Sequence, residues 1–277
     1  MIQLVILDVE GVLTPPENSR KSWSLNNFLN IRQFVRNQRP KIVCILCTGR
    51  QVSYGEAVIQ ALDFFFPFPK NRAQEFADSW KTELLSWPSV FENGACFYDP
   101  MAKKLIKNLE MTEAQLNHIR EIRAKVVPSL IRDTGCQLEP GKIFSISLNP
   151  PLRPGSRTKR VSTNKFRPLV DEAMQNFKNY VNINHSASAI DITPKGITKA
   201  SAVNFLLKNT GVKPEEVLGV GDTAADEEWL TVVGWSASPA NGKGKLKHVN
   251  YFSPYEVTDG LFDILKNLEA HNYRKVG

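Results

Sequence analysis

The chain has 277 residues, of which 42% are hydrophobic and 23% charged, an ordinary globular composition that excludes a disordered or collagen-like protein. Four cysteines are too few for a disulfide scaffold, and because no secretory signal is recognised at the start, we expect a cytoplasmic protein. No apolar run approaches the roughly 20 residues that a membrane-spanning helix needs, so no membrane contact is predicted.

The first part of the chain predicts alternating strands and helices. Residues 3–8 and 41–48 are short, β-rich apolar runs that each end in polar residues. Residues 24–37 and 52–65 space their apolar side chains as helices do. This order is typical of an α/β fold with crossover helices, so we predict a Rossmann-like parallel sheet.

The middle of the chain predicts a different architecture. Residues 112–131 and 165–177 have helical spacing, whereas residues 142–148 alternate like a strand with one face in water. Two more short strands are expected at 180–183 and 187–192. We interpret residues 101–184 as an inserted α+β cap domain.

The last part of the chain returns to the α/β pattern. Helices are predicted at 198–208 and 224–233, and strands at 216–220 and 235–238. We therefore predict that residues 1–100 and 185–277 form one α/β core.

The basic excess of the chain lies in the predicted cap. The formal net charge is +7, and residues 101–184 hold 15 Lys and Arg against 7 Asp and Glu, whereas the rest hold 20 against 21. Residues 150–163 are expected to form a mobile basic loop that contains Arg153, Arg157, Lys159 and Arg160. This charge suits an anionic small molecule, or a solvated surface with no partner. No nucleic-acid partner is predicted, because interleaved aromatic residues and DNA-reading motifs are missing.

Polar residues follow three of the predicted parallel strands. Asp8, Thr48 and Asp222 stand at strand ends, where ligands bind in parallel α/β sheets. Glu10 and Asp226 add two more carboxylates nearby. Carboxylates that converge on one sheet edge repel each other unless a cation lies among them, and such oxygen ligands favour Mg²⁺.

These residues resemble the four ordered motifs of the haloacid dehalogenase superfamily of phosphatases and phosphotransferases. The motifs are Asp8 with Glu10, Thr48 to Arg50, Lys199, and Asp222 with Asp226. The segments 92–95 and 192–199, on either side of the insertion, resemble the Cof and sucrose-phosphatase-like branch, which carries a large C2-type cap at this place. Residues 6–15 are also similar to eukaryotic phosphomannomutases, which share this cap class.

The resemblance implies a role for each matched residue. Asp8 would attack phosphorus to form an aspartyl phosphate, and Glu10 would protonate the leaving oxygen and later activate water. Mg²⁺ would be held by Asp8, the backbone carbonyl of Glu10 and Asp222, with Asp226 binding it directly or through water.

Further residues would hold the substrate. Thr48 and Lys199 would bind the remaining phosphoryl oxygens, and Gly49, Arg50 and Asn93 are candidate substrate contacts. Arg50 is equally suited to a salt bridge within the core, and Asn93 to forming a turn with the glycine that follows it.

The chain departs from the pattern of the resembled family at two positions. Glu10 stands where the family usually has Asp, and Ala225 where many members have Asn. Because the longer side chain would move the carboxylate by roughly an ångström, we expect slow turnover.

We predict a Mg²⁺-dependent phosphatase that acts on a small phosphorylated metabolite, with sugar phosphates as the leading class, working as a monomer or homodimer. A sugar-phosphate phosphotransferase of mutase type and a catalytically weak protein that binds a phosphometabolite are the alternatives.

Overall fold

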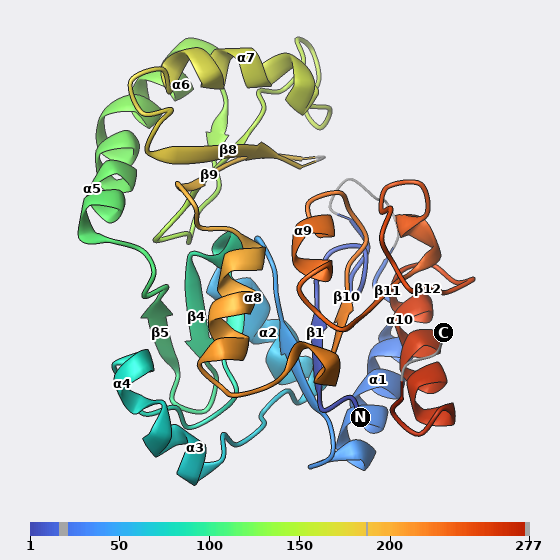
Figure 1. Cartoon of the computed structure of the whole chain (residues 1–277). Helices are drawn as coiled ribbons and strands as arrows, with labels where there is room; N and C mark the ends of the chain where they lie inside the picture. Colours follow the sequence, from blue (N-terminus) through green and yellow to red (C-terminus); the bar gives the residue numbers. More distant parts are fainter. Residues whose placement is uncertain (17–21, 187, 275–277) are drawn as a thin grey trace. The chain divides into compact units, whose positions relative to one another are not determined.

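The computed structural model describes residues 1–16, 22–186 and 188–274, and the chain divides into two compact units (Figure 1). The core unit comprises Met1–Ile106 and Lys199–Gly277, and the inserted unit comprises Lys107–Thr198. The insertion thus starts and ends later than the expected boundaries of 101 and 184. Its end moves to Thr198 because the two strands before that residue pair with the sheet of the inserted unit.

The core unit contains most of the helices and strands. In chain order they are β1 (Leu4–Leu7), α1 (Leu25–Gln38), β2 (Val43–Leu46), α2 (Val52–Leu62), α3 (Lys70–Glu75), α4 (Ala77–Trp80), β3 (Ser89–Phe91), η1 (Glu92–Gly94), β4 (Cys96–Asp99), β5 (Lys104–Lys107), α8 (Lys199–Lys208), η3 (Pro214–Glu216), β10 (Val217–Val220), α9 (Glu227–Leu230), β11 (Trp235–Ser238), η4 (Ala240–Gly242), β12 (Tyr251–Phe252) and α10 (Val257–Ala270).

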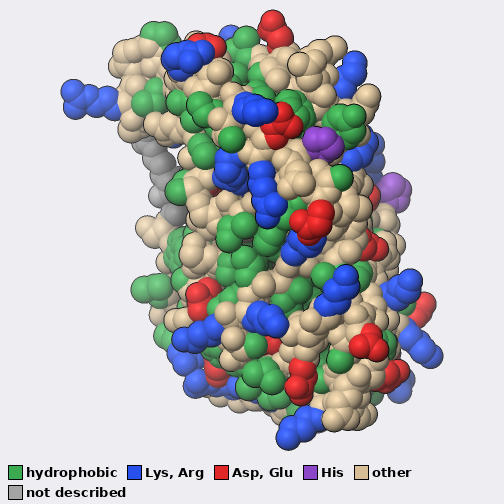
Figure 2. Space-filling model, turned by 90° about the vertical axis from the view of Figure 1, so that its left-hand side faces the viewer, with side chains coloured by type: hydrophobic (Ala, Val, Ile, Leu, Met, Phe, Trp, Pro, Cys, Tyr) green, Lys and Arg blue, Asp and Glu red, His purple; other side chains and the backbone are tan. Residues whose placement is uncertain are grey.

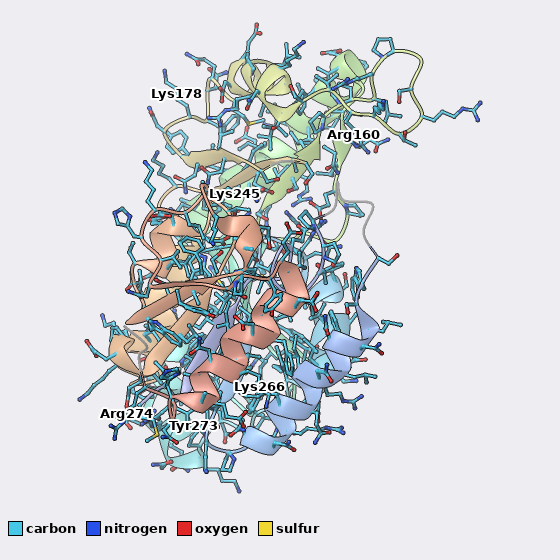
Figure 3. The ribbon with its side chains drawn as sticks, turned by 90° about the vertical axis from the view of Figure 1, so that its right-hand side faces the viewer. Arg160, Lys178, Lys245, Lys266, Tyr273 and Arg274 are labelled. Carbon is cyan, nitrogen blue, oxygen red and sulfur yellow. The ribbon has the colours of Figure 1, made fainter. Side chains whose placement is uncertain are left out.

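A parallel five-stranded sheet forms the centre of the core unit, in the order β12-β11-β10-β1-β2. Every residue of β1 is buried, as expected for a strand that is covered on both faces. Helices α1 and α10 lie on one side of the sheet and α8 on the other (Figures 1 and 3). The predicted α/β core is therefore confirmed.

The register of the sheet brings three strand ends level. Leu7, the last residue of β1, pairs with Val220 of β10 and with Leu46 of β2. The segments that follow these strands consequently emerge side by side at one edge. Strand β3 of a second, three-stranded sheet adjoins this edge, because the N–H of Thr48 donates to the carbonyl of Val90 at 3.0 Å.

The inserted unit has the predicted α+β organisation. Its elements are α5 (Glu113–Glu121), the π-helical turn η2 (Ile122–Val126), α6 (Val127–Thr134), β6 (Gln137–Leu138), β7 (Ile146–Asn149), α7 (Thr163–Ala173), β8 (Val181–His185) and β9 (Ile190–Pro194). The four strands form an antiparallel sheet in the order β6-β7-β9-β8. Apolar side chains of the helices and of this sheet form one buried cluster.

The basic segment at 150–163 is held together by hydrogen bonds. The N–H of Val161 donates to the carbonyl of Pro151 at 2.9 Å, and the guanidinium of Arg160 donates to the carbonyl of Pro150 at 2.7 Å. Arg160 also donates to Oε1 of Gln137 at 2.6 Å, whereas Arg157 is exposed. The charge of Arg160, labelled in Figure 3, is therefore directed at its own unit.

The surface of the molecule carries charges of both signs. On the face in Figure 2, Lys and Arg side chains are interspersed with Asp and Glu rather than gathered in one patch. Within the described residues, no helix is both long and apolar enough to cross a membrane.

Candidate active site

Three of the four predicted carboxylates meet at the edge of the parallel sheet. Asp8 directly follows β1, Asp222 lies just beyond β10, and Asp226 immediately precedes α9. One carboxylate oxygen of each lies within 4.8 Å of those of the other two, and all three residues are buried. We call Asp8, Asp222 and Asp226 the carboxylate cluster.

Lys199 supplies a positive charge to the carboxylate cluster. Its Nζ lies 2.7 Å from Oδ1 of Asp226 and 3.2 Å from Oδ2 of Asp8. Burial lowers the pKa of Lys199, but the charges of Asp226 and Asp8 outweigh burial and raise it, so the side chain stays protonated. The predicted lysine therefore lies beside the predicted nucleophile.

Asp226 organises the segment that follows β10. Its Oδ2 accepts hydrogen bonds from the N–H groups of Asp222, at 3.2 Å, and Thr223, at 3.0 Å. Its Oδ1 accepts from Nε1 of Trp229 at 2.9 Å, as well as from Lys199. Burial raises the pKa of Asp226, but the charge of Lys199 and these hydrogen bonds lower it below its usual value. With both oxygens engaged, Asp226 is better placed to bind a cation through water than directly.

Asp222 keeps one carboxylate oxygen for a ligand. Its Oδ2 accepts from Nδ2 of Asn241 at 2.9 Å and lies 3.7 Å from Nζ of Lys245. Its Oδ1 is buried and has no hydrogen-bond partner among the described residues. A buried carboxylate oxygen is costly to leave unpaired, so this atom fits a cation ligand.

The electrostatics of the carboxylate cluster also favour a bound cation. Burial and the charge of Asp226 raise the pKa of Asp222 to about 7. The same two causes raise the pKa of Asp8 well above its usual value, although Lys199 opposes them. The donor set consists of carboxylate oxygens, which suit a hard divalent cation such as Mg²⁺.

Glu10 lies apart from the carboxylate cluster, in an ion pair with Arg50. Nε of Arg50 donates to Oε2 of Glu10 at 3.0 Å, and Nη2 of Arg50 donates to Oε1. Of the two roles expected for Arg50, the structure contains the salt bridge within the core. The carboxylate of Glu10 is therefore fixed by Arg50, and it is not simply the usual aspartate carboxylate moved by one methylene.

Thr48, Gly49 and Asn93 form one packed corner. The buried Oγ1 of Thr48 accepts from the N–H of Arg50 at 3.2 Å, and the carbonyl of Thr48 accepts from the N–H of Asn93 at 3.2 Å. Asn93 is left-handed, with φ 56°, as expected of a turn residue. A Cβ at position 49 would lie 2.6 Å from Oδ1 of Asn93, so a larger residue there would have to displace the Asn93 side chain.

Sequence analysis missed Asn241, Lys245 and Trp229. Asn241 also donates to the carbonyl of Gly11 at 3.0 Å, and Lys245 is labelled in Figure 3 on the segment between β11 and β12. Asn241 follows the parallel strand β11, so the strand-end argument that found Asp222 applies to it as well. Trp229 gave no such signal, because an indole in a short helix is usually a core residue.

Part of this chain is similar in sequence to a known family and to curated proteins. A family model described as haloacid dehalogenase-like hydrolase matches residues 155–265. A curated phosphoglycolate phosphatase from Staphylothermus marinus is 30% identical over 84 residues, which cover 30% of this chain and 35% of the relative. A chloroplastic YBEY endoribonuclease from Arabidopsis thaliana is 32% identical over 84 residues, 30% of this chain and 14% of that protein.

The fold is shared over nearly the whole chain. A haloacid dehalogenase-like hydrolase from Bacteroides thetaiotaomicron superposes with a TM-score of 0.66 and 16% identity, covering 97% of this chain and 100% of that one. The curated relatives, in contrast, match this chain over about a third of their length or less.

Proposed function

We propose that the chain is a haloacid dehalogenase-like, Mg²⁺-dependent phosphatase that hydrolyses a small phosphomonoester through an aspartyl phosphate, since a family model of that description matches residues 155–265. The observation that carries this proposal is the carboxylate cluster. Its Asp222 offers a buried oxygen that no described residue hydrogen-bonds, close to Asp8 and to the charged Lys199.

In the first step, an oxygen of Asp8 attacks phosphorus, and the bond from phosphorus to the leaving oxygen breaks with its electron pair on that oxygen. Val9 orients the nucleophile, because its N–H donates to Oδ1 of Asp8 at 2.8 Å. Lys199, 3.2 Å from Oδ2 of Asp8, neutralises charge on the phosphoryl oxygens. Glu10 is a carboxylate in its ion pair with Arg50, so it takes up a proton from solvent before it supplies the one that an alkoxide leaving group needs.

In the second step, water attacks the phosphorus of the aspartyl phosphate and transfers a proton to Glu10. The bond between Asp8 and phosphorus breaks, inorganic phosphate leaves, and the Asp8 carboxylate is restored. Glu10 thus acts first as an acid and then as a base, and loss of the proton it has taken from water to solvent restores the ion pair with Arg50.

Asp8, Asp222 and the backbone carbonyl of Glu10 would hold Mg²⁺, with Asp226 contributing through water. The cation would neutralise the negative charge that collects on the phosphoryl group during transfer.

The proposed substrate is a small phosphorylated metabolite. The relatives named phosphoglycolate phosphatase support a compact phosphomonoester, and sugar phosphates remain the leading class from the sequence. We propose a cytoplasmic monomer or homodimer without a nucleic-acid or membrane partner. The pairing of Glu10 with Arg50 favours one second candidate, a protein that binds a phosphometabolite but turns it over slowly.

A substrate screen tests this proposal. Phosphate release is measured from p-nitrophenyl phosphate, phosphoglycolate and a panel of sugar phosphates, with Mg²⁺ and with a chelator. Metal-dependent release supports the phosphatase, and isomerised sugar phosphate without net release identifies a mutase. Tight binding of one compound by calorimetry without turnover supports the binding protein, and neither turnover nor binding contradicts the proposal.

A further inference from the structure

Arg50 and Tyr54 connect the two ends of the turn that carries Glu10. The guanidinium of Arg50 holds both carboxylate oxygens of Glu10 and lies over the ring of Tyr54, with its carbon 5.4 Å from the ring centroid. The hydroxyl of Tyr54 lies 3.4 Å from Oγ1 of Thr14. Glu10 and Thr14 are themselves bridged through their backbones. These contacts close a ring of four residues around the turn.

Arg50 is itself fixed in place. Its N–H donates to Oγ1 of Thr48, and its carbonyl accepts from the N–H of Glu92 at 3.1 Å. Only 16% of its side chain is exposed. A guanidinium with two hydrogen bonds to one carboxylate fixes the orientation of that carboxylate more firmly than a single contact can.

We infer that Arg50 is a positioning residue that fixes the carboxylate of Glu10, and that the ring of Tyr54 supports the guanidinium of Arg50. The inference rests on the proposed function, since it gives Glu10 a place in proton transfer. A glutamate has one more rotatable bond than an aspartate, and burying it costs more rotamer freedom. The contact with Arg50 removes that freedom before substrate arrives, and the extra methylene is what allows Glu10 to reach Arg50.

This role differs from the substrate contact that the sequence also suggested for Arg50. A residue that binds the substrate contributes to KM, whereas a residue that acts through Glu10 contributes to kcat. The contribution should also depend on the leaving group, because p-nitrophenolate leaves without a proton and an alkoxide does not.

The kinetic test compares kcat and KM of the full chain on p-nitrophenyl phosphate and on an alkyl phosphate that the wild type hydrolyses. The variants are Arg50→Gln, Arg50→Lys, Glu10→Gln and the double variant Arg50→Gln with Glu10→Gln. Arg36→Gln is the control, because Nε of the more exposed Arg36 lies 2.7 Å from Oδ2 of Asp63 in an ion pair that does not involve the turn.

We expect Arg50→Gln to lower kcat on the alkyl phosphate roughly 10- to 100-fold, with KM unchanged and p-nitrophenyl phosphate little affected. Arg50→Lys should restore only part of the rate, since an ammonium cannot make the paired contact. The double variant should be no slower than Glu10→Gln alone. A raised KM with unchanged kcat, equal losses on both esters, additive losses, or an increase in kcat would each overturn the inference.

Amide hydrogen exchange tests the same inference without activity. Arg50→Gln should speed exchange in the peptide that covers residues 9–14, and Arg36→Gln should leave that peptide unchanged. If the wild type hydrolyses no phosphate ester, the proposed function fails, while the exchange measurement still decides the positioning role. Unchanged exchange in Arg50→Gln would overturn it.

Discussion

Gly11 and the carboxylate of Asp222 occupy a space that has no room for a side chain at position 11. A Cβ on Gly11 would overlap Asp222, and the backbone of Gly11 is left-handed, with φ 77°. The turn after Asp8 can therefore approach the carboxylate cluster only because position 11 is a glycine.

Gly11→Ala should displace either the turn or the Asp222 carboxylate. We expect a loss of at least about 100-fold in kcat/KM, because misplacement by an ångström is enough for such a loss. Phosphate release measured beside the melting temperature checks this. Gly155→Ala is the control, since Gly155 is also left-handed but has open space around it. Full activity in Gly11→Ala would contradict the geometry described for the turn.

Asp222→Asn should abolish high-affinity Mg²⁺ binding while leaving the protein folded. The substitution keeps the shape of the side chain but removes the charge of the carboxylate whose buried Oδ1 has no hydrogen-bond partner in the described part of the chain. Calorimetric titration with Mg²⁺ provides the measurement. Asp99→Asn is not a suitable control, because Asp99 accepts hydrogen bonds from Leu85 and Ser86. Asp171→Asn is suitable, because Asp171 lies in the inserted unit and its side chain, 46% exposed, forms an ion pair with Arg167. Equal Mg²⁺ affinity in Asp222→Asn would exclude this residue as a ligand.

The residues at the strand ends show which parts of the site can be predicted from the sequence. Asp8, Asp222 and Asp226 were predicted because parallel strands direct their following residues to one edge, whereas Lys199 was predicted only from the family resemblance; the structure brings these four together. The ion pair of Glu10 with Arg50 was one of two alternatives, since periodicity does not determine which partner a flexible arginine takes. The end of the insertion was expected at 184, before the strand predicted at 187–192, because only the pairing of β9 with β7 and β8 assigns that strand to the inserted sheet.

The stabilising effect of Mg²⁺ should depend on pH. The raised pKa of Asp222, about 7 in the cation-free protein, means that the folded state holds a proton that the unfolded state releases at lower pH. This contribution to the free energy of unfolding is present below about pH 4 and is lost as pH rises through about 7. Bound Mg²⁺ should offset the loss, so it should raise the melting temperature more at about pH 8 than at about pH 5.5. In Asp222→Asn this difference should disappear, and an equal Mg²⁺ effect at both pH values in the wild type would contradict the account.

Glu10→Asp should lower kcat, although it restores the residue that is usual in the resembled family. The shorter side chain cannot reach both donors of Arg50, so its carboxylate loses the fixed orientation. We expect kcat on a substrate with a poor leaving group to fall roughly 10- to 100-fold, with Mg²⁺ affinity unchanged. Steady-state kinetics with parallel calorimetry would measure this. A higher kcat in Glu10→Asp would indicate that the extra methylene of Glu10 misplaces its carboxylate.

The measurement closest to the central claim is phosphate release by the wild type and by Asp8→Asn, each with Mg²⁺ and with a chelator, after both proteins are shown to be folded. The account predicts release by the wild type only with Mg²⁺, and a loss of at least about 10⁴-fold in Asp8→Asn, since the nucleophile of covalent catalysis is removed. Turnover by Asp8→Asn at a rate near the wild type, or release by the wild type that persists in the chelator, would contradict it.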